Sequence, residues 1–185
     1  MSKLTLSITL LIIILVQPSA AKMNSSKLFN PITQDPVERT NPIGLVYQDY
    51  MGVKNSLSRD RADSAAFFAA KLSQEIGLVT MDKLSSAQYD AWTKFATKLS
   101  NDAVKIRNTK EIERQRENFM TLSINMYEML KVFNTNSEIV YYQFCPMANK
   151  GKGAYWISDQ SKIANPYFGK SMLRCGSTKA TILVK

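Results

Sequence analysis

The feature that most constrains the fold is a change in the spacing of apolar residues near residue 134. Between residues 42 and 133 apolar side chains recur at steps of three, four or seven, which is the spacing of one helix face. After residue 138 the chain becomes rich in β-branched and aromatic residues, which is typical of a strand. The sequence therefore predicts a mainly α protein, an antiparallel helical bundle with a small C-terminal β appendage.

Helix signals divide the first part of this pattern into four segments. Pro42 suits a first helical turn with Asn41 as its cap, and Gly77 is a good helix stop. Ser85 with Gln88 three residues later forms the pattern of a capping box. The helices are expected at about 42–57, from after 60 to about 76, from 85 to beyond 103, and from about 109 to 133.

The β appendage is expected to begin at about residue 138. Residues 138–144 form the strongest strand pattern, and residues 154–157 look like its partner across a turn at 149–153. A second turn is expected at 165–169 and a last short strand at 181–184.

The N-terminus has the organisation of a targeting segment. Lys3 is the only charged side chain before Lys22, and an apolar run from Ile8 to Val16 ends at Gln17 and Pro18. Small residues at 19–21 then offer a cleavage site, so residues 1–21 are predicted to be a secretory signal peptide. The run is too short to span a bilayer, and the mature chain is expected to be periplasmic or secreted, with no transmembrane segment.

The mature chain is predicted to consist of a flexible leader followed by one domain. Residues 22–41 contain prolines and polar residues with little periodicity, and residues 42–185 form a single predicted domain. The formal charge of +9 could indicate nucleic acid, but export argues against such a partner. The basic residues of the third and fourth helices are read as exposed: Arg107, Lys110, Arg114 and Arg116.

The absence of histidine removes many kinds of active site. With 0 His and 2 Cys, the chain cannot build a Ser-His-Asp triad, a Cys-His dyad or a His-ligated zinc site. No arrangement of Lys, carboxylates or Cys resembles an activated nucleophile. A non-enzymatic protein is therefore expected.

Four sulfur atoms in the appendage are the main chemical signal. Cys145 and Met147 lie near one another in sequence, as do Met172 and Cys175. Thiolates and thioethers are soft ligands that select Cu(I), so these four residues are a candidate metal site. Two aromatic residues could wall this site, although core packing is an alternative for both: Tyr155 and Trp156.

A disulfide between Cys145 and Cys175 is the alternative reading of the same residues. An exported protein meets an oxidising compartment, and two cysteines pair without remainder. The protein would then be a disulfide-stabilised interaction module without metal. The two states can also alternate, because a reduced pair could hold Cu(I) and an oxidised pair could not.

Four C-terminal motifs carry a resemblance to a known family. They are Tyr142–Ala148, Gly153–Ser158, Asn165–Gly169 and Met172–Gly176. In this order, and with residues 109–123 as the last bundle helix, they resemble a bacterial family of uncharacterised exported domains. That family also occurs fused to periplasmic adaptor subunits of copper/silver and other heavy-metal efflux systems. The resemblance covers about residues 44–176 and implies a copper or heavy-metal context, with metal-efflux components as partners.

Overall fold

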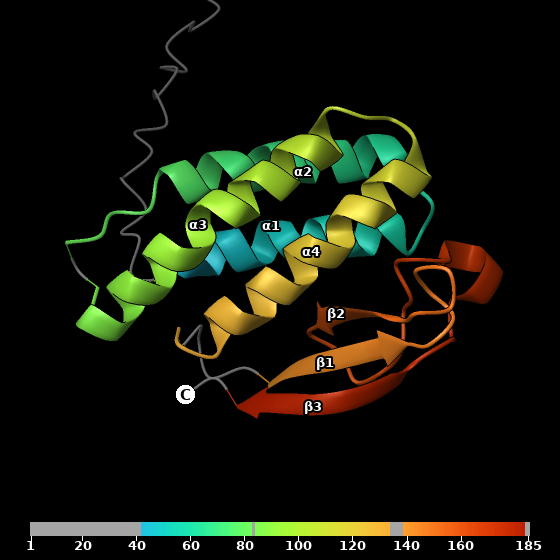
Figure 1. Cartoon of the computed structure of the whole chain (residues 1–185). Coiled ribbons are helices and arrows are strands. Elements are labelled where there is room, and N and C mark those ends of the chain that lie inside the picture. The colour runs from blue at the N-terminus through green and yellow to red at the C-terminus, as the bar shows by residue number, and fades with distance from the viewer. Residues whose placement is uncertain (1–41, 83, 134–138, 184–185) are drawn as a thin grey trace, which may run out of the picture. The chain divides into compact units, whose positions relative to one another are not determined.

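The computed structural model describes residues 42–82, 84–133 and 139–183 (Figure 1). The predicted signal peptide, the predicted leader and the Asn41 cap lie outside the described residues. The same is true of Glu138 and Val184, which are the first residue of the first predicted strand and the last residue of the last one.

Four α-helices follow the predicted order. They are α1 (Pro42–Leu57), α2 (Ala62–Gly77), α3 (Ser86–Arg107) and α4 (Ile112–Leu130). The capping box before α3 is confirmed, because Gln88 N–H donates to Ser85 Oγ at 3.4 Å and Ser85 N–H donates to Gln88 Oε1 at 3.0 Å. Local spacing and caps therefore locate these helices to within a few residues.

Successive helices pack against one another, α1 on α2, α2 on α3 and α3 on α4. Small residues on α2 permit this, because Ala65 and Ala69 are fully buried. The first and last helices also meet, since the Tyr50 and Phe119 rings stack with centroids 5.2 Å apart.

Three antiparallel strands form one sheet in the order β2-β1-β3. β1 (Ile139–Cys145) lies in the centre, with β2 (Ala154–Ser158) on one side and β3 (Ser177–Leu183) on the other. A short 3₁₀ helix, η1 (Gly169–Met172), precedes β3. The expected strands are confirmed, and β3 begins four residues earlier than the predicted start at 181. The extra length comes from pairing with β1, in which Phe144 lies opposite Ser177.

The sheet lies against α1 and α4 (Figure 1). Tyr50 of α1 joins the parts, because its hydroxyl lies 2.8 Å from Ser123 Oγ of α4 and accepts a hydrogen bond from Ile157 N–H of β2 at 3.1 Å. The buried apolar side chains of the sheet, including Val140, Trp156 and Ile157, belong to the same core cluster as those of the helices. The helices and the sheet are thus packed around one hydrophobic core.

Candidate functional site

Cys145 is the last residue of β1, and strand alternation decides which way its thiol points. Cross-strand pairing places Cys145 opposite Ala154 and Gln143 opposite Trp156. Residues two apart on a strand share a face, so these four side chains lie on one face of the sheet. Cys145 and Trp156 are both completely buried there.

The segment after β2 covers this face and delivers the second cysteine. Gln143 Nε2 donates to the carbonyls of Gln160 and Ser161, at 2.9 and 3.2 Å. The buried Asn165 amide donates to the carbonyl of Cys175 at 2.9 Å. These side-chain to main-chain bonds hold the segment over the sheet and fix Cys175 just before β3.

The two sulfur atoms meet at this point, with Cys145 Sγ 2.8 Å from Cys175 Sγ. Both cysteines are free thiols, the first buried and the second half-buried. The hydrogen bond to Cys145, with desolvation and the charge on Cys145 as smaller causes, raises the pKa of the Cys175 thiol. The two sulfurs are therefore less than 1 Å farther apart than the S–S bond of about 2.05 Å in a disulfide.

The two methionines of the candidate set lie in different surroundings. Met147 follows β1 in a turn, is 55% exposed, and lines a cleft of about 310 Å³ beside Met120 of α4. Among the described residues, neither cysteine lines this cleft. Met172 ends η1 and is half-buried, and its carbonyl accepts a hydrogen bond from Cys175 N–H at 3.0 Å. The fold thus brings the thiols together and leaves Met147 on a neighbouring surface.

The two aromatic residues predicted to wall the site lie on opposite faces of the sheet. Trp156 adjoins the cysteine segment, because a Cβ added at Gly176 would lie 2.8 Å from its Cη2 atom. Tyr155 is on the other face and stacks on Tyr142, with centroids 4.6 Å apart, and Tyr142 stacks on Tyr127 of α4 at 3.7 Å. Only Trp156 is therefore placed beside the thiols.

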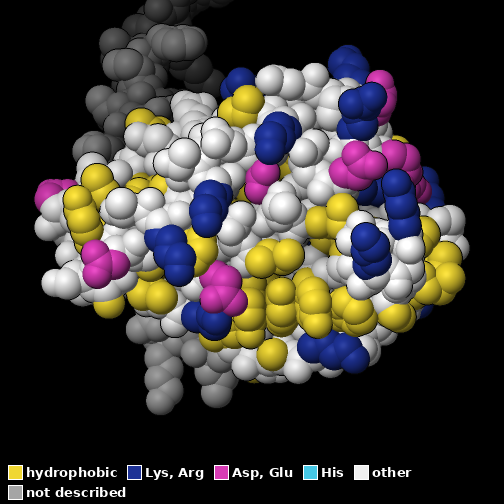
Figure 2. All heavy atoms as spheres, in the orientation of Figure 1, with side chains coloured by type: hydrophobic (Ala, Val, Ile, Leu, Met, Phe, Trp, Pro, Cys, Tyr) yellow, Lys and Arg dark blue, Asp and Glu magenta, His cyan; other side chains and the backbone are white. Residues whose placement is uncertain are grey.

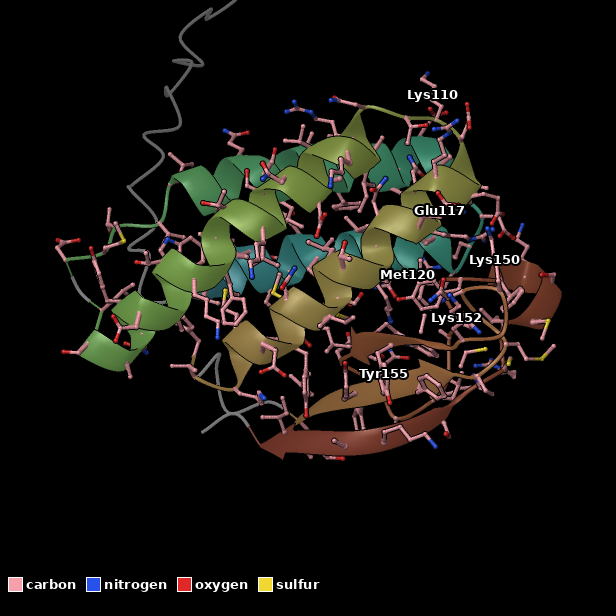
Figure 3. All side chains as sticks on the ribbon, viewed as in Figure 1. Lys110, Glu117, Met120, Lys150, Lys152 and Tyr155 are labelled. Carbon is pink, nitrogen blue, oxygen red and sulfur yellow. The ribbon has the colours of Figure 1, made fainter. Side chains whose placement is uncertain are left out.

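The Tyr155 side of the sheet forms an apolar strip with α4. Figure 2 shows apolar side chains gathered along this face, and Figure 3 places Tyr155 below α4 and Met120 above the sheet. Lys150 and Lys152 of the β1–β2 turn lie beside one end of this strip, to the right of Tyr155 and Met120 in Figure 3. We define the aromatic strip as Tyr127, Tyr142, Tyr155 and Phe144, which contact one another in that order.

Arg116 contradicts the prediction that it is an exposed helix residue. Its side chain is 9% exposed, whereas Arg107, Lys110 and Arg114 are exposed as expected. Arg116 Nε donates to the carbonyl of Pro166 at 2.9 Å, and Nη2 donates to Asp60 Oδ1 at 2.7 Å. The physical reason is its place on the inner face of α4, three residues before the buried Phe119, where a cation needs acceptors. The three-residue spacing between Arg116 and Phe119 is the sequence signal that could have predicted the burial of Arg116.

The comparisons with known proteins agree with an uncharacterised helical domain. Residues 46–138 match the family model described as "Protein of unknown function (DUF3347)", and the chain belongs to this family. The match spans most of α1 to α4 and ends before β1, so the cysteine pair lies beyond it. No curated protein and no solved structure matches the chain.

Two kinds of feature are absent from the described residues. No helix among them has the length and apolar character that crossing a membrane requires. The same residues contain no group of three or more His, Cys, Asp or Glu side chains placed to hold a metal ion.

Proposed function

We propose that the protein is an exported, non-enzymatic binding protein that takes up a soft metal ion, Cu(I), through Cys145 and Cys175 in their reduced form. The observation that supports this proposal is the 2.8 Å approach of the two sulfurs from positions 30 residues apart. Thiolates are soft donors, and two of them side by side favour Cu(I) over hard cations. The heavy-metal efflux or homeostasis context, with efflux components as partners, rests on the resemblance of the C-terminal motifs.

Metal uptake requires a small opening of the pair. With thiolate–metal distances of about 2.3 Å, two sulfurs on one tetrahedral ion lie roughly 3.8 Å apart. The sulfurs would therefore separate by about 1 Å, and Cys175 is the half-buried partner whereas Cys145 is buried. Because the metal displaces thiol protons, uptake should strengthen as the pH rises.

Met147 and Met172 are proposed as additional thioether ligands. Met172 is three residues before Cys175 and joined to it by a main-chain hydrogen bond, so it lies in the turn that leads directly to that cysteine. Met147 is two residues after Cys145 but lines the neighbouring cleft, and the turn would have to rearrange to deliver it. Met172 is expected to contribute more than Met147 for this reason.

A competition experiment with reduced protein tests the metal proposal. Anaerobic protein is titrated into the Cu(I)–bicinchoninate complex, and the loss of colour gives stoichiometry and affinity. One Cu(I) per chain is expected, with loss of binding in the double variant Cys145→Ser/Cys175→Ser. Met172→Leu should weaken binding by about tenfold, the scale of one lost ligand contact.

The matched control for the thioether variants is Met81→Leu. Met81 is 44% exposed in the connection after α2, far in sequence from the sulfur pair. Its substitution should leave Cu(I) affinity unchanged. Retention of stoichiometric Cu(I) by a folded double-serine variant would exclude the thiol pair as the metal site.

A disulfide-stabilised interaction module without metal is the second candidate. The sulfur separation favours it, because 2.8 Å is closer to a disulfide than to two ligands of one ion. The exposed side of the aromatic strip offers an apolar surface for a protein partner. A mass about two protons light, with no trappable thiol and no copper in protein from its native compartment, would support this candidate and exclude a resting metal site.

The finer arrangement of the helices is part of the same proposal. The connections between helices are short and successive helices pack together, which favours an up-and-down antiparallel bundle.

A further inference from the structure

A second cleft, of about 300 Å³, lies at the C-terminal end of α1, outside the sulfur pair and the aromatic strip. One wall comes from the last turn of α1 and the turn that follows it, and the other from two stretches of the segment that covers the sheet. The lining residues that carry the argument are Lys54, Arg59, Gln160, Lys162 and Arg174.

The charged side chains that line this cleft are all positive. Four of its lining residues are cations, Lys54, Arg59, Lys162 and Arg174, and none is a carboxylate. Within the described residues, Arg59, Lys162 and Arg174 form no ion pair that would neutralise them. Like charges gathered in a concave site raise the local concentration of anions.

Lys54 is the buried member of this group, with only 2% of its side chain exposed. Its ammonium donates to Ser158 Oγ at 3.4 Å, and the nearest carboxylate, Asp159, is 4.0 Å away and 44% exposed. An ammonium group has three N–H donors, and Ser158 accepts from one of them. Lys54 lines the cleft, so its remaining donors are available to a ligand there. Burying a charge with so few partners is costly unless something else compensates it.

The other side of the cleft is held in place. Arg174 Nη1 donates to the carbonyl of Ile163 at 2.6 Å, which fixes the guanidinium beside the opening. Its remaining N–H groups can still present a fork to an oxyanion. Gln160 N–H donates to Ser158 Oγ at 3.1 Å, so the hydroxyl next to Lys54 is also positioned.

We propose that this cleft binds a phosphoryl group, with Lys54 as the buried counter-ion and Arg174 as the forked donor at the opening. Arg59 and Lys162 add positive charge at the rim. A phosphoryl group fits this set because its several oxygens accept from ammonium and guanidinium donors at once. The group comes either from free phosphate or a soluble phosphate ester, or from the headgroup of an anionic lipid.

Two probes test the proposal on the full mature chain at low ionic strength. Inorganic phosphate is titrated and followed by amide chemical shifts, and sedimentation measures binding to phosphatidylcholine vesicles with and without phosphatidic acid. Saturable binding of either probe is expected, with shifts at residues 54–59, 160–164 and 173–174. Binding of both, with competition between them, indicates free phosphate chemistry, and binding of vesicles alone indicates a lipid headgroup.

Charge-matched variants decide whether the site is specific. Arg174→Gln and Lys54→Met should each weaken the observed binding by about tenfold, the value of one charge-assisted hydrogen bond. Lys98→Gln, which removes an exposed cation from α3, should change it by less than about twofold because it alters only the overall charge. Lys162→Gln serves as a surface variant in case Lys54→Met fails to fold.

Two results would overturn the proposal. One is the absence of saturable binding of either probe by the unmodified chain. The other is an equal loss of binding in Lys98→Gln and Arg174→Gln, since attraction to net positive charge would then explain the affinity without a site.

Discussion

Arg116 shows how much of this fold depends on single polar side chains. From one position on α4 its guanidinium reaches the main chain at Leu57 and Pro166 and the carboxylates of Asp60 and Glu113. It therefore joins the end of α1, the inner face of α4 and the segment that carries Cys175. Gln115, the preceding residue, also joins separate segments of the chain. Its Nε2 donates to the carbonyls of Ala62 and Thr109 at 3.0 and 2.7 Å.

We expect Arg116→Lys to lower the free energy of unfolding by about 2–3 kcal/mol, although it keeps the charge. A lysine has no planar fork and cannot serve these acceptors together. Urea denaturation checks the prediction, with Arg114→Lys as the control, because Arg114 pairs with Glu111 in solvent at 69% exposure. The control should cost less than about 0.5 kcal/mol, and equal losses in the two variants would contradict the role given to Arg116.

The burial of Lys54 leads to a separate prediction about how the stability of the fold depends on pH. Burial lowers the pKa of Lys54 to about 8, with Asp159 opposing the shift and Arg59 adding to it. In the unfolded chain the pKa is about 10.4, so between pH 8 and 10.4 the unfolded state binds more protons and stability rises with pH. Lys54 thus destabilises the fold below pH 8, and this cost disappears as the pH approaches 10.4.

The variant Lys54→Met should be more stable than the unmodified chain at pH 7 by about 1–3 kcal/mol, and this difference should shrink toward pH 10. Urea denaturation of both proteins at the two pH values gives the comparison. Tyrosine ionisation affects both chains alike, so the difference isolates Lys54. A constant difference across the range would mean that folding does not lower the pKa of Lys54.

At the scale of elements, the segment around η1 is shaped by one close contact. Gly169 has φ +55°, and a Cβ there would overlap Asp60 Oδ1 and Arg116 Nη2. Asp60 cannot move aside easily, because its other oxygen accepts from Lys170 N–H at 3.1 Å. Burial raises the pKa of Asp60, but the hydrogen bonds from Lys170 N–H and Arg116 outweigh burial and hold that pKa below its usual value.

We expect Gly169→Ala to destabilise the protein by about 2–4 kcal/mol, from left-handed backbone strain and a clash with an ion pair. Gly151→Ala is the matched control, since its φ is +82° but nothing lies within 4 Å of an added Cβ. The control should cost only the backbone term, about 1–2 kcal/mol. Thermal or urea unfolding measures both, and a loss in Gly169→Ala no larger than the control would show that η1 shifts without cost.

At the scale of the whole molecule, a shared core predicts cooperative unfolding. The buried residues of the helices and the sheet form one cluster, and Tyr50 bonds to both α4 and β2. The chain contains 2 tryptophans. Trp92 lies in α3 and Trp156 in β2, so each reports on one part of the fold.

Single-tryptophan variants can test this cooperativity. In both Trp92→Phe and Trp156→Phe, the fluorescence of the remaining tryptophan should change at the same urea concentration as the helical circular dichroism of that variant. Each variant is compared with its own circular dichroism, because both substitutions alter the core. A sheet transition that precedes the helical one would show that the β appendage unfolds independently.

The sequence by itself determined the elements. Helical spacing, the Ser85 capping box and the Gly77 stop located four helices, and β-branched and aromatic runs located the strands. These signals are local, because a cap or an amphipathic face is decided by residues three or four positions apart. The zero count of histidine likewise excluded several sites without any structure.

Only the tertiary structure decided which of these residues meet. It paired Cys145 with Cys175, kept Met147 in another cleft, and gathered Lys54 with Arg174 in a cleft. Each of these outcomes depends on how the segment after β2 folds back over the sheet and against the end of α1. That path is set by hydrogen bonds between residues far apart in the chain, and spacing along the sequence carries no record of them.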